Sequence, residues 1–149
     1  MKLYQAGPLF TEAERLWHKN FQTYLEDKGF TALWPGGLIT SHDVVSWGKD
    51  APKKILEADK ALLLDCDAVV ALLDGPQVDD GTAWEIGFAH AMNKPVFGIR
   101  TDFRNGGECL GASVNAMIEG CVECIAKSKD ELAHELRKYQ LKNSPPSVE

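Results

Sequence analysis

Short apolar runs alternate with longer amphipathic segments along most of the chain. The runs lie at Lys2–Ala6, Phe30–Trp34, Asp67–Leu73, Pro95–Ile99 and Cys121–Ile125. The third run is almost entirely apolar, which is typical of a strand buried on both faces of a parallel sheet. The pattern therefore predicts five strands.

Helices are predicted in the segments between these strands. A capping box, Thr11-x-x-Glu14, begins the first helix, and Gly29 ends it. A second capping box, at Ser128, opens the last helix. The other expected helices run from Pro52 to about Asp65, over Thr82–Met92 and over Ser113–Glu119.

The alternation of strands and helices indicates an α/β fold with a parallel sheet covered on both faces. One domain is expected over residues 1–141, followed by a disordered tail at 142–149. Ligands of such sheets bind beyond the carboxyl ends of the strands, where the strand order reverses. That rule selects the connections Gly7–Phe10, Asp74–Gly81 and Thr101–Ala112. The Gly-rich segment Pro35–Asp50 is interpreted as one long functional or mobile loop.

The charge balance excludes some classes of partner. The chain has 149 residues, with 22 Asp and Glu against 16 Lys and Arg and a formal net charge of −6. Because the basic residues are scattered, neither a nucleic acid polymer nor an anionic membrane is expected as a partner. No apolar run approaches the roughly 18–20 residues that span a bilayer, and no signal peptide is recognised. The protein is therefore expected to be cytoplasmic.

The cysteines and histidines do not form a metal-binding pattern. In a reducing compartment the four cysteines are expected to be free thiols: Cys66, Cys109, Cys121 and Cys124. Cys121-x-x-Cys124 lacks a second ligand pair and is interpreted as two buried or half-buried thiols in a strand. His18 is interpreted as an ordinary polar helix position. No phosphate- or dinucleotide-binding glycine motif is present, so neither a metal nor a cofactor is expected.

The loop after the third strand is the densest in candidate chemistry. Asp79 and Asp80 are placed to cap the next helix, and Glu85 follows within its first turn or so. There the helix dipole favours negative charge by about 0.3–1 kcal/mol, which predicts an ionised carboxylate even when it is partly desolvated. An ionised carboxylate is the group needed to attack the anomeric carbon of a sugar. The alternative interpretation is that the three carboxylates only cap and solvate a helix start.

Neighbouring loops offer groups that complement such a carboxylate. Tyr4 stands near the carboxyl end of the first strand, from which its hydroxyl can hydrogen-bond a carboxylate of the next loop. Phe10 and Trp47 offer flat apolar faces for a planar base. Taken singly, each of these side chains is more often a packing residue.

Three motifs together resemble the nucleoside 2-deoxyribosyltransferases. They are Tyr4-Gln5-Ala6-Gly7-Pro8-Leu9-Phe10, the segment Asp79–Gly87, and Val114-Asn115-Ala116-Met117-Ile118, and their order and spacing match from about residue 2 to about residue 140. The resemblance implies a flavodoxin-like sheet and a double-displacement exchange. A carboxylate attacks the anomeric carbon of a 2′-deoxynucleoside, the base leaves, and a free nucleobase attacks the deoxyribosyl-enzyme.

The resemblance also assigns catalytic roles. Glu85 is the expected nucleophile, Tyr4 is the hydroxyl that orients it, and Asp59 handles protons and hydrogen bonds at the base. Without the resemblance, Asp59 would be interpreted as a plain surface residue.

The expected substrate contacts come from the loops. The resemblance places Asp79 at the sugar hydroxyl end and Phe10 beside the base, and Gly7 and Trp47 complete the set within one chain. Asn115 and Met117 match positions that, in the family, reach into the site of an adjacent subunit. A homo-oligomer with shared active sites is therefore implied.

A nucleotide substrate is the nearest alternative. The 2′-deoxynucleoside 5′-monophosphate N-hydrolases share the fold and bind the phosphate with serines at the positions of Asp79 and Asn115. An Asp there would repel a phosphate dianion, at a cost on the order of several kcal/mol in a partly buried site, so a nucleoside is preferred. Arg100 and Arg104 could still offer a phosphate site.

A catalytically silent nucleotide-sensing domain is the third candidate. Such a domain would tolerate the loss of Glu85. The joint presence of Tyr4, Asp59, Asp79 and Glu85 weighs against it.

Overall fold

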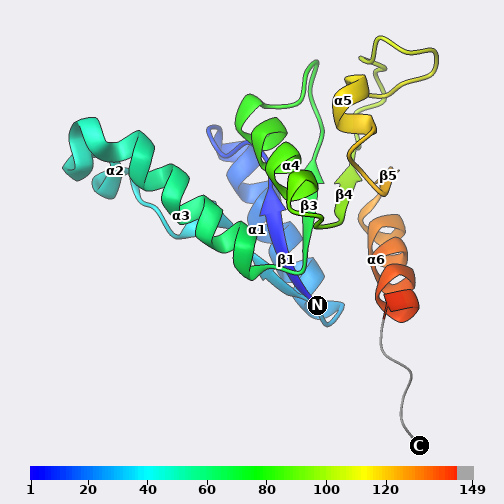
Figure 1. Ribbon diagram of the computed structural model, residues 1–149, viewed down its shortest axis with the longest axis horizontal. Coiled ribbons are helices and arrows are strands. Elements are labelled where there is room, and N and C mark those ends of the chain that lie inside the picture. Colours follow the sequence, from blue (N-terminus) through cyan, green and yellow to red (C-terminus); the bar gives the residue numbers. More distant parts are fainter. Residues whose placement is uncertain (144–149) are drawn as a thin grey trace, which may run out of the picture.

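Five parallel strands form one sheet at the centre of the molecule (Figure 1). The computed structural model describes residues 1–143. The strands are β1 (Lys2–Ala6), β2 (Thr31–Leu33), β3 (Ala68–Leu72), β4 (Val96–Ile99) and β5 (Cys124–Ala126). Their order is β2-β1-β3-β4-β5 and each adjacent pair is parallel, which confirms the expected flavodoxin-like α/β architecture.

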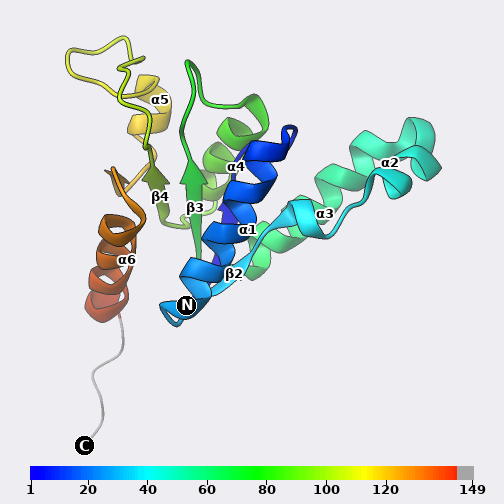
Figure 2. The same ribbon diagram turned by 180° about the vertical axis from the view of Figure 1, so that it is seen from behind.

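Helices cover both faces of this sheet, as Figures 1 and 2 show from opposite sides. One face carries α1 (Glu12–Asp27) and α6 (Lys129–Asn143), and the other carries α3 (Ala51–Asp65) and α4 (Asp80–Ala91). Residues 142–143 of the expected tail are the last residues of α6, and 144–149 lie outside the described residues.

The strands supply a separate hydrophobic core to each face. Successive side chains of a strand point to opposite faces, so Leu3 belongs to the core under α1 and α6, and Tyr4 to the core under α3 and α4. All five residues of β3 are buried, as its apolar run predicted. Each Å² of apolar surface removed from water stabilises the fold by about 25 cal/mol, so an apolar strand is favoured at the centre of the sheet.

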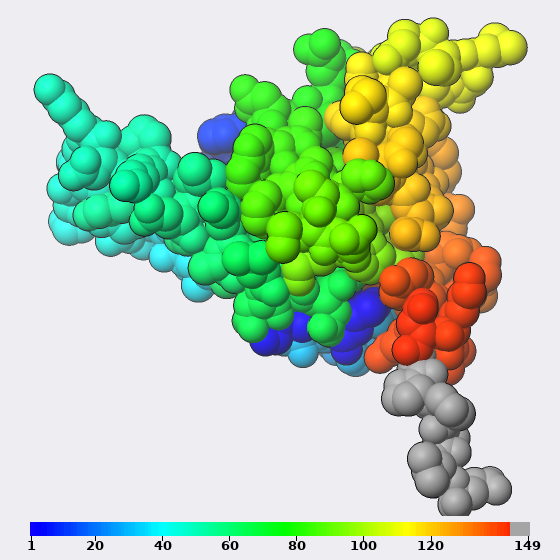
Figure 3. Space-filling model, viewed as in Figure 1, coloured from blue at the N-terminus to red at the C-terminus, as the bar shows by residue number. Residues whose placement is uncertain are grey.

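The segment between β2 and α3 is not the single loop that its glycines predicted. It folds into a 3₁₀ turn (Pro35–Gly37), helix α2 (Ser41–Trp47) and a second 3₁₀ turn (Gly48–Asp50). Thr40 and Asp43 form a capping box at the start of α2: the Thr40 amide donates to the Asp43 carboxylate at 2.9 Å, and the Asp43 amide donates to the Thr40 hydroxyl at 3.2 Å. Together α2 and the adjoining start of α3 form an arm that projects from the body of the molecule (Figures 1 and 3).

Two predicted boundaries near the C-terminus also shift. Helix α5 spans only Ala116–Glu119, because Asn115 caps it. Strand β5 starts at Cys124 rather than Cys121, because the Cys121 amide still donates to a carbonyl of α5 at 3.0 Å. Cys121 and Cys124 are half-buried and free, as expected, whereas the free thiol of Cys109 is exposed.

Candidate active site

The strand order reverses between β1 and β3, so the loops that follow these strands flank the crevice where a ligand is expected. Tyr4 on β1 is wholly buried, and its hydroxyl donates a hydrogen bond to Oε1 of Glu85 on α4. The two residues are 81 positions apart in the sequence. The fold therefore brings together two residues on which the resemblance placed related roles.

Glu85 does not lie at the start of its helix. Since α4 begins at Asp80, Glu85 lies in the second turn, beyond the free amides on which the helix dipole depends. Burial raises the pKa of Glu85 to about 8, with the charges of Asp59 and Asp79 acting in the same direction and the Tyr4 hydrogen bond opposing them. The expectation that the dipole keeps this carboxylate ionised was therefore wrong, because desolvation outweighs it.

Asp59, on α3, belongs to the same electrostatic environment. Its charge raises the pKa of both Tyr4 and Glu85. Burial raises its own pKa to about 6, and its Oδ1 is buried without a hydrogen-bond partner in the described part of the chain. It borders a hollow of about 430 Å³ whose opposite wall includes Leu38 and Ile39. A buried polar atom of this kind costs free energy that a ligand's donor can recover.

Asp79 is held in place as the N-cap of α4. Its Oδ2 accepts hydrogen bonds from the amide of Thr82 at 2.9 Å and from the Thr82 hydroxyl at 3.0 Å. Two donors on one oxygen fix the orientation of the carboxylate and leave the second oxygen for a ligand. The sequence analysis had not singled out Thr82, although Asp79-x-x-Thr82 has the spacing of an N-cap pair.

The loop after β1 is held by the start of α1. The Glu14 carboxylate accepts from the amides of Phe10 at 2.9 Å and Thr11 at 2.7 Å, and Arg15 donates to the carbonyls of Leu9 and Phe10. The Phe10 ring is 72% exposed. It is therefore accessible to a ligand at the edge of the crevice.

Gly7 and Trp47 have very different surroundings. A Cβ atom at position 7 would lie 2.5 Å from the ring of His18, so only glycine fits there. His18 itself is fully buried, which contradicts its interpretation as an ordinary polar position. Trp47 ends α2 on the projecting arm, with the Lys54 ammonium 5.3 Å from its ring centre (Figure 1).

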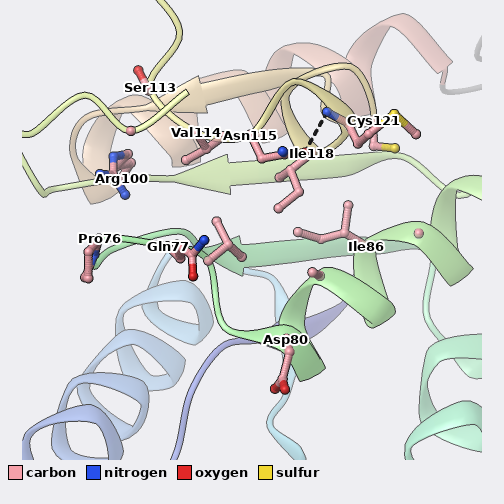
Figure 4. A pocket seen from close by; sticks show the side chains of 15 residues that line it. Pro76, Gln77, Asp80, Ile86, Arg100, Ser113, Val114, Asn115, Ile118 and Cys121 are labelled. Atoms are coloured by element: carbon pink, nitrogen blue, oxygen red, sulfur yellow. Dashed lines mark hydrogen bonds between the residues drawn. The ribbon is translucent and has the colours of Figure 1, made fainter. Parts of the chain in front are cut away.

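Asn115 and Met117 lie on another side of α4. They line a cleft of about 480 Å³ between α4 and α5, which Figure 4 shows from close by. Helix α4 contributes Ala83 and Gly87 to this cleft, but not Glu85. Within one chain, the structure therefore does not bring Asn115 and Met117 to Glu85.

Arg100 and Arg104 are already committed to partners within the chain. Arg100 is 1% exposed and donates to the carbonyls of Leu73, Gly75 and Arg104. Arg104 holds both carboxylate oxygens of Asp102, and this pairing keeps the pKa of Asp102 well below its usual range. The two guanidinium groups therefore do not form the phosphate site that their positions in the sequence suggested.

Metal and membrane binding were examined over the same residues. Within 1–143, no group of three or more His, Cys, Asp or Glu side chains is arranged to hold a metal ion. In this range there is also no helix whose length and apolar character would let it cross a membrane.

The fold and the buried Tyr–Glu pair at its switch point are those of an α/β enzyme domain. Residues 3–117 match the family model described as Nucleoside 2-deoxyribosyltransferase. Because the match covers more than half of its residues, the chain belongs to the nucleoside 2-deoxyribosyltransferase family, which is a family of enzymes.

Solved structures share this fold over nearly the whole chain. A conserved protein from Enterococcus faecalis V583 has a TM-score of 0.80 at 27% identity, over 93% of this chain and 98% of its own. The 2-deoxyribosyltransferase of Bacillus psychrosaccharolyticus has a TM-score of 0.71 at 19% identity, over 99% and 94% of the two chains. The CMP N-glycosidase of Clostridium botulinum has a TM-score of 0.60 at 20% identity, over 93% and 99%. At these identities the last two similarities establish the fold alone.

A curated relative matches only part of the chain. The uncharacterized protein C191.05c of Schizosaccharomyces pombe is 39% identical over 61 residues, which cover 38% of this chain and 29% of that protein. The chain therefore spans less than a third of the length of this relative.

Proposed function

We propose that the protein cleaves the N-glycosidic bond of 2′-deoxynucleosides and transfers the 2-deoxyribosyl group to a second, free nucleobase. The observation that carries the proposal is the hydrogen bond from the buried Tyr4 hydroxyl to Glu85, with the unpaired carboxylate of Asp59 in the same environment. Membership of the family supports the same class of reaction. No cofactor has a role in the proposed chemistry.

In the first half of the reaction, the Glu85 carboxylate attacks C1′ of the sugar. The C1′–N bond breaks, and its electron pair moves to the base. Tyr4 holds Oε1, which leaves Oε2 to form the ester with C1′. Protonated Asp59 gives its proton to the leaving nitrogen. The pKa of Asp59, about 6 because of burial, keeps part of this group protonated near neutral pH.

In the second half, a nitrogen of the acceptor base attacks C1′. The C1′–Oε2 bond breaks, Glu85 regains its negative charge, and Asp59 takes the proton of the attacking nitrogen. The pKa of about 8 makes the charged form of Glu85 scarce in the empty site, but a carboxylate with a raised pKa is also a stronger nucleophile. Positive charge that develops at C1′ stabilises the ionised form in the transition state.

The surroundings of the sugar favour a nucleoside over a nucleotide. Asp79, held by Thr82, presents a carboxylate that suits a neutral sugar hydroxyl and repels a phosphate dianion. Arg100 and Arg104, which might have offset that repulsion, are bound to carbonyls and to Asp102. These observations support deoxynucleosides as the substrate class.

The proposed enzyme is a homo-oligomer with shared sites. The exposed side chains of Asn115 and Met117 lie on another side of α4 from Glu85, so within their own chain they are not positioned to contact its substrate. Both are free to reach the substrate of a neighbouring subunit, and Met117 is 77% exposed.

One assay separates the candidate functions. The protein is incubated with deoxyinosine and free adenine, and in parallel with deoxynucleoside 5′-monophosphates, and the products are resolved by chromatography. Deoxyadenosine and hypoxanthine are expected from the first mixture. Free deoxyribose without deoxyadenosine would indicate a hydrolase, cleavage of monophosphates alone would indicate the nucleotide N-hydrolase, and no product in either mixture would indicate the nucleotide-sensing domain.

The covalent step has its own test. Incubation with a fluorinated deoxyribosyl analogue is expected to add the mass of one sugar to the protein, on the peptide that contains Glu85. Catalysis with an adduct on another peptide would contradict the assignment of the nucleophile.

A further inference from the structure

A buried histidine lies under the loop that follows β1, and it has no role in the proposed reaction. His18, on α1, is fully buried, and its ring stacks on Trp34 with 5.6 Å between ring centres and 11° between ring planes. The Gln5 amide, on β1, reaches the same histidine twice. Its Nε2 lies 2.8 Å from Nδ1 of the ring and donates to the main-chain oxygen of His18 at 2.9 Å.

These hydrogen bonds decide which ring nitrogen carries the proton. A main-chain oxygen only accepts, so Gln5 must turn its NH₂ group toward His18, and the same NH₂ group faces Nδ1. Nδ1 is therefore the acceptor. Burial lowers the pKa of His18 to about 4, so the ring is neutral near pH 7 and its single proton is on Nε2.

The Nε2 edge of the ring faces the loop. A Cβ atom at Gly7 would lie 2.5 Å from both Cε1 and Nε2 of His18, so the main chain of the loop rests directly on this edge. Nε2 is buried and has no hydrogen-bond partner of ordinary geometry among residues 1–143. The main chain of Pro8 nevertheless raises the pKa of the ring against the effect of burial, as a nearby acceptor does.

The other face of the ring leads to the second segment that borders the site. Trp34 precedes the 3₁₀ turn Pro35–Gly37, and it fits under Gly36, where a Cβ atom would lie 2.4 Å from its ring. The chain then continues to Leu38 and Ile39, which wall the hollow beside Asp59. One buried ring therefore contacts both segments that flank the Tyr4–Glu85 pair.

We propose that His18 is a positioning residue whose imidazole sets the place of the loop Gly7–Phe10 beside the Tyr4–Glu85 pair. The proposal rests on the proposed function, because the loop carries the side chain expected beside the base. His18 touches no reacting atom. It acts through main-chain contact with Gly7 and through the Nε2–H donor that faces Pro8.

The kinetic test compares variants that keep different parts of the ring. His18→Phe keeps the flat ring but removes both nitrogens, and His18→Gln keeps a donor near the place of Nε2. For His18→Phe, KM for deoxyinosine is expected to rise about tenfold while kcat changes less than about threefold, since the loop contacts the substrate before and during the reaction. His18→Gln is expected to restore KM to within about threefold of wild type. The matched controls, His134→Phe and His134→Gln, change an exposed histidine of α6 and should leave both constants unchanged.

A measurement without substrate separates this proposal from the proposed function. Hydrogen exchange of the amides of residues 7–11 is expected to be faster in His18→Phe than in wild type, and to be slowed again in His18→Gln. If wild type cleaves no deoxynucleoside, the proposed function fails, and the exchange rates alone decide whether His18 positions the loop. Exchange in His18→Phe equal to wild type overturns the proposal, and so does an unchanged KM in an active enzyme.

A pair of smaller changes covers the case in which His18→Phe does not fold. Gly7→Ala is expected to speed the same exchange, because its Cβ atom meets the His18 ring. In a His18→Ser background that clash is removed, so Gly7→Ala should have a much smaller effect there. Equal effects of Gly7→Ala in both backgrounds would overturn the contact on which the proposal depends.

Discussion

Two groups of carboxylates near the carboxyl edge of the same sheet have opposite surroundings. Asp102 accepts from Arg104 at 2.9 Å and from the Gly75 amide at 3.2 Å, and these bonds hold its pKa well below the usual range. Glu85 and Asp59 are buried and have no cation as a cause of their shifts, so burial raises their pKa values to about 8 and about 6.

The comparison teaches how one fold uses carboxylates for stability and for chemistry. The group around Asp102 is paired with a guanidinium and with amides, so it holds two loops together. The pair of Glu85 and Asp59 is left short of partners, so its free energy is improved only when a ligand supplies them. Unpaired, desolvated acids of this kind mark a candidate active site more reliably than acids that are merely close together.

The largest expected effect comes from removing the charge of Glu85. In Glu85→Gln the side chain still accepts from Tyr4, but an amide does not attack C1′, so kcat/KM should fall at least about 10³-fold. Rates of base exchange measured by chromatography check this, with Glu57→Gln, on the exposed side of α3, as the control. Exchange within tenfold of wild type would remove Glu85 from the mechanism.

Breaking the paired group should instead affect stability. Arg100→Met leaves the carbonyls of Leu73 and Gly75 and the carboxylate of Asp102 without their buried donor. The free energy of unfolding, measured in urea, should fall by about 3 kcal/mol. Arg104→Met, at a half-exposed side chain, should cost no more than about 1 kcal/mol. Equal losses in the two variants would contradict the distinction between them.

The acid of the unpaired group should shape the pH profile. The active form has Asp59 protonated and Glu85 ionised, so kcat/KM in wild type should rise to a plateau between about pH 6 and pH 8 and fall at higher pH as the pair ionises fully. Asp59→Asn should lower the plateau about 10²-fold and abolish the fall at high pH. A fall that persists in Asp59→Asn would assign that limb to another group.

Ionisation of Glu85 should also cost stability. Its pKa is raised by folding, so the stability it contributes is complete below the unfolded value of 4.5 and is lost as pH rises through about 8. Between pH 5 and pH 9, wild type should therefore lose about 1–3 kcal/mol relative to Glu85→Gln, after allowance for residual solvent. Thermal melts of both proteins across this range measure the difference, and parallel curves would show that Glu85 is not desolvated.

The smallest expected effect belongs to the shared site. Asn115→Ala should lower kcat/KM by about three- to tenfold by damaging the pocket of a neighbouring subunit. Light scattering should report an oligomer, and mixing Asn115→Ala with Glu85→Gln subunits should restore some activity, because hybrids contain one intact site. Glu119→Ala, on the same helix, is the control. A fully active monomer would contradict the shared site.

Local patterns were enough to predict most of the architecture. The apolar run of β3 and the capping boxes of α1 and α6 act through neighbours within a few residues, so their outcome is legible in a short window. The order of these elements then predicted the switch point and the loops around it. The motifs with Tyr4 and Glu85 pointed to one site, and these two residues do meet.

Other features depended on atoms far away in the sequence. Thr40 and Asp43 carried a local signal for α2 that went unrecognised because Asp took the place of Glu. The burial of His18 had no such signal, because its neighbours Gln5, Gly7 and Trp34 come from three different segments.

Charge states separate the two kinds of information most clearly. The positions of acids and bases along the chain, and the fold class that brings them to one edge, follow from short-range patterns of polarity. Which acid is paired and which is left desolvated was decided only by tertiary packing. Arg100 went to the carbonyls of two loops and Glu85 went into the core beside Tyr4, because hydrogen bonding and desolvation depend on neighbours in space rather than along the chain.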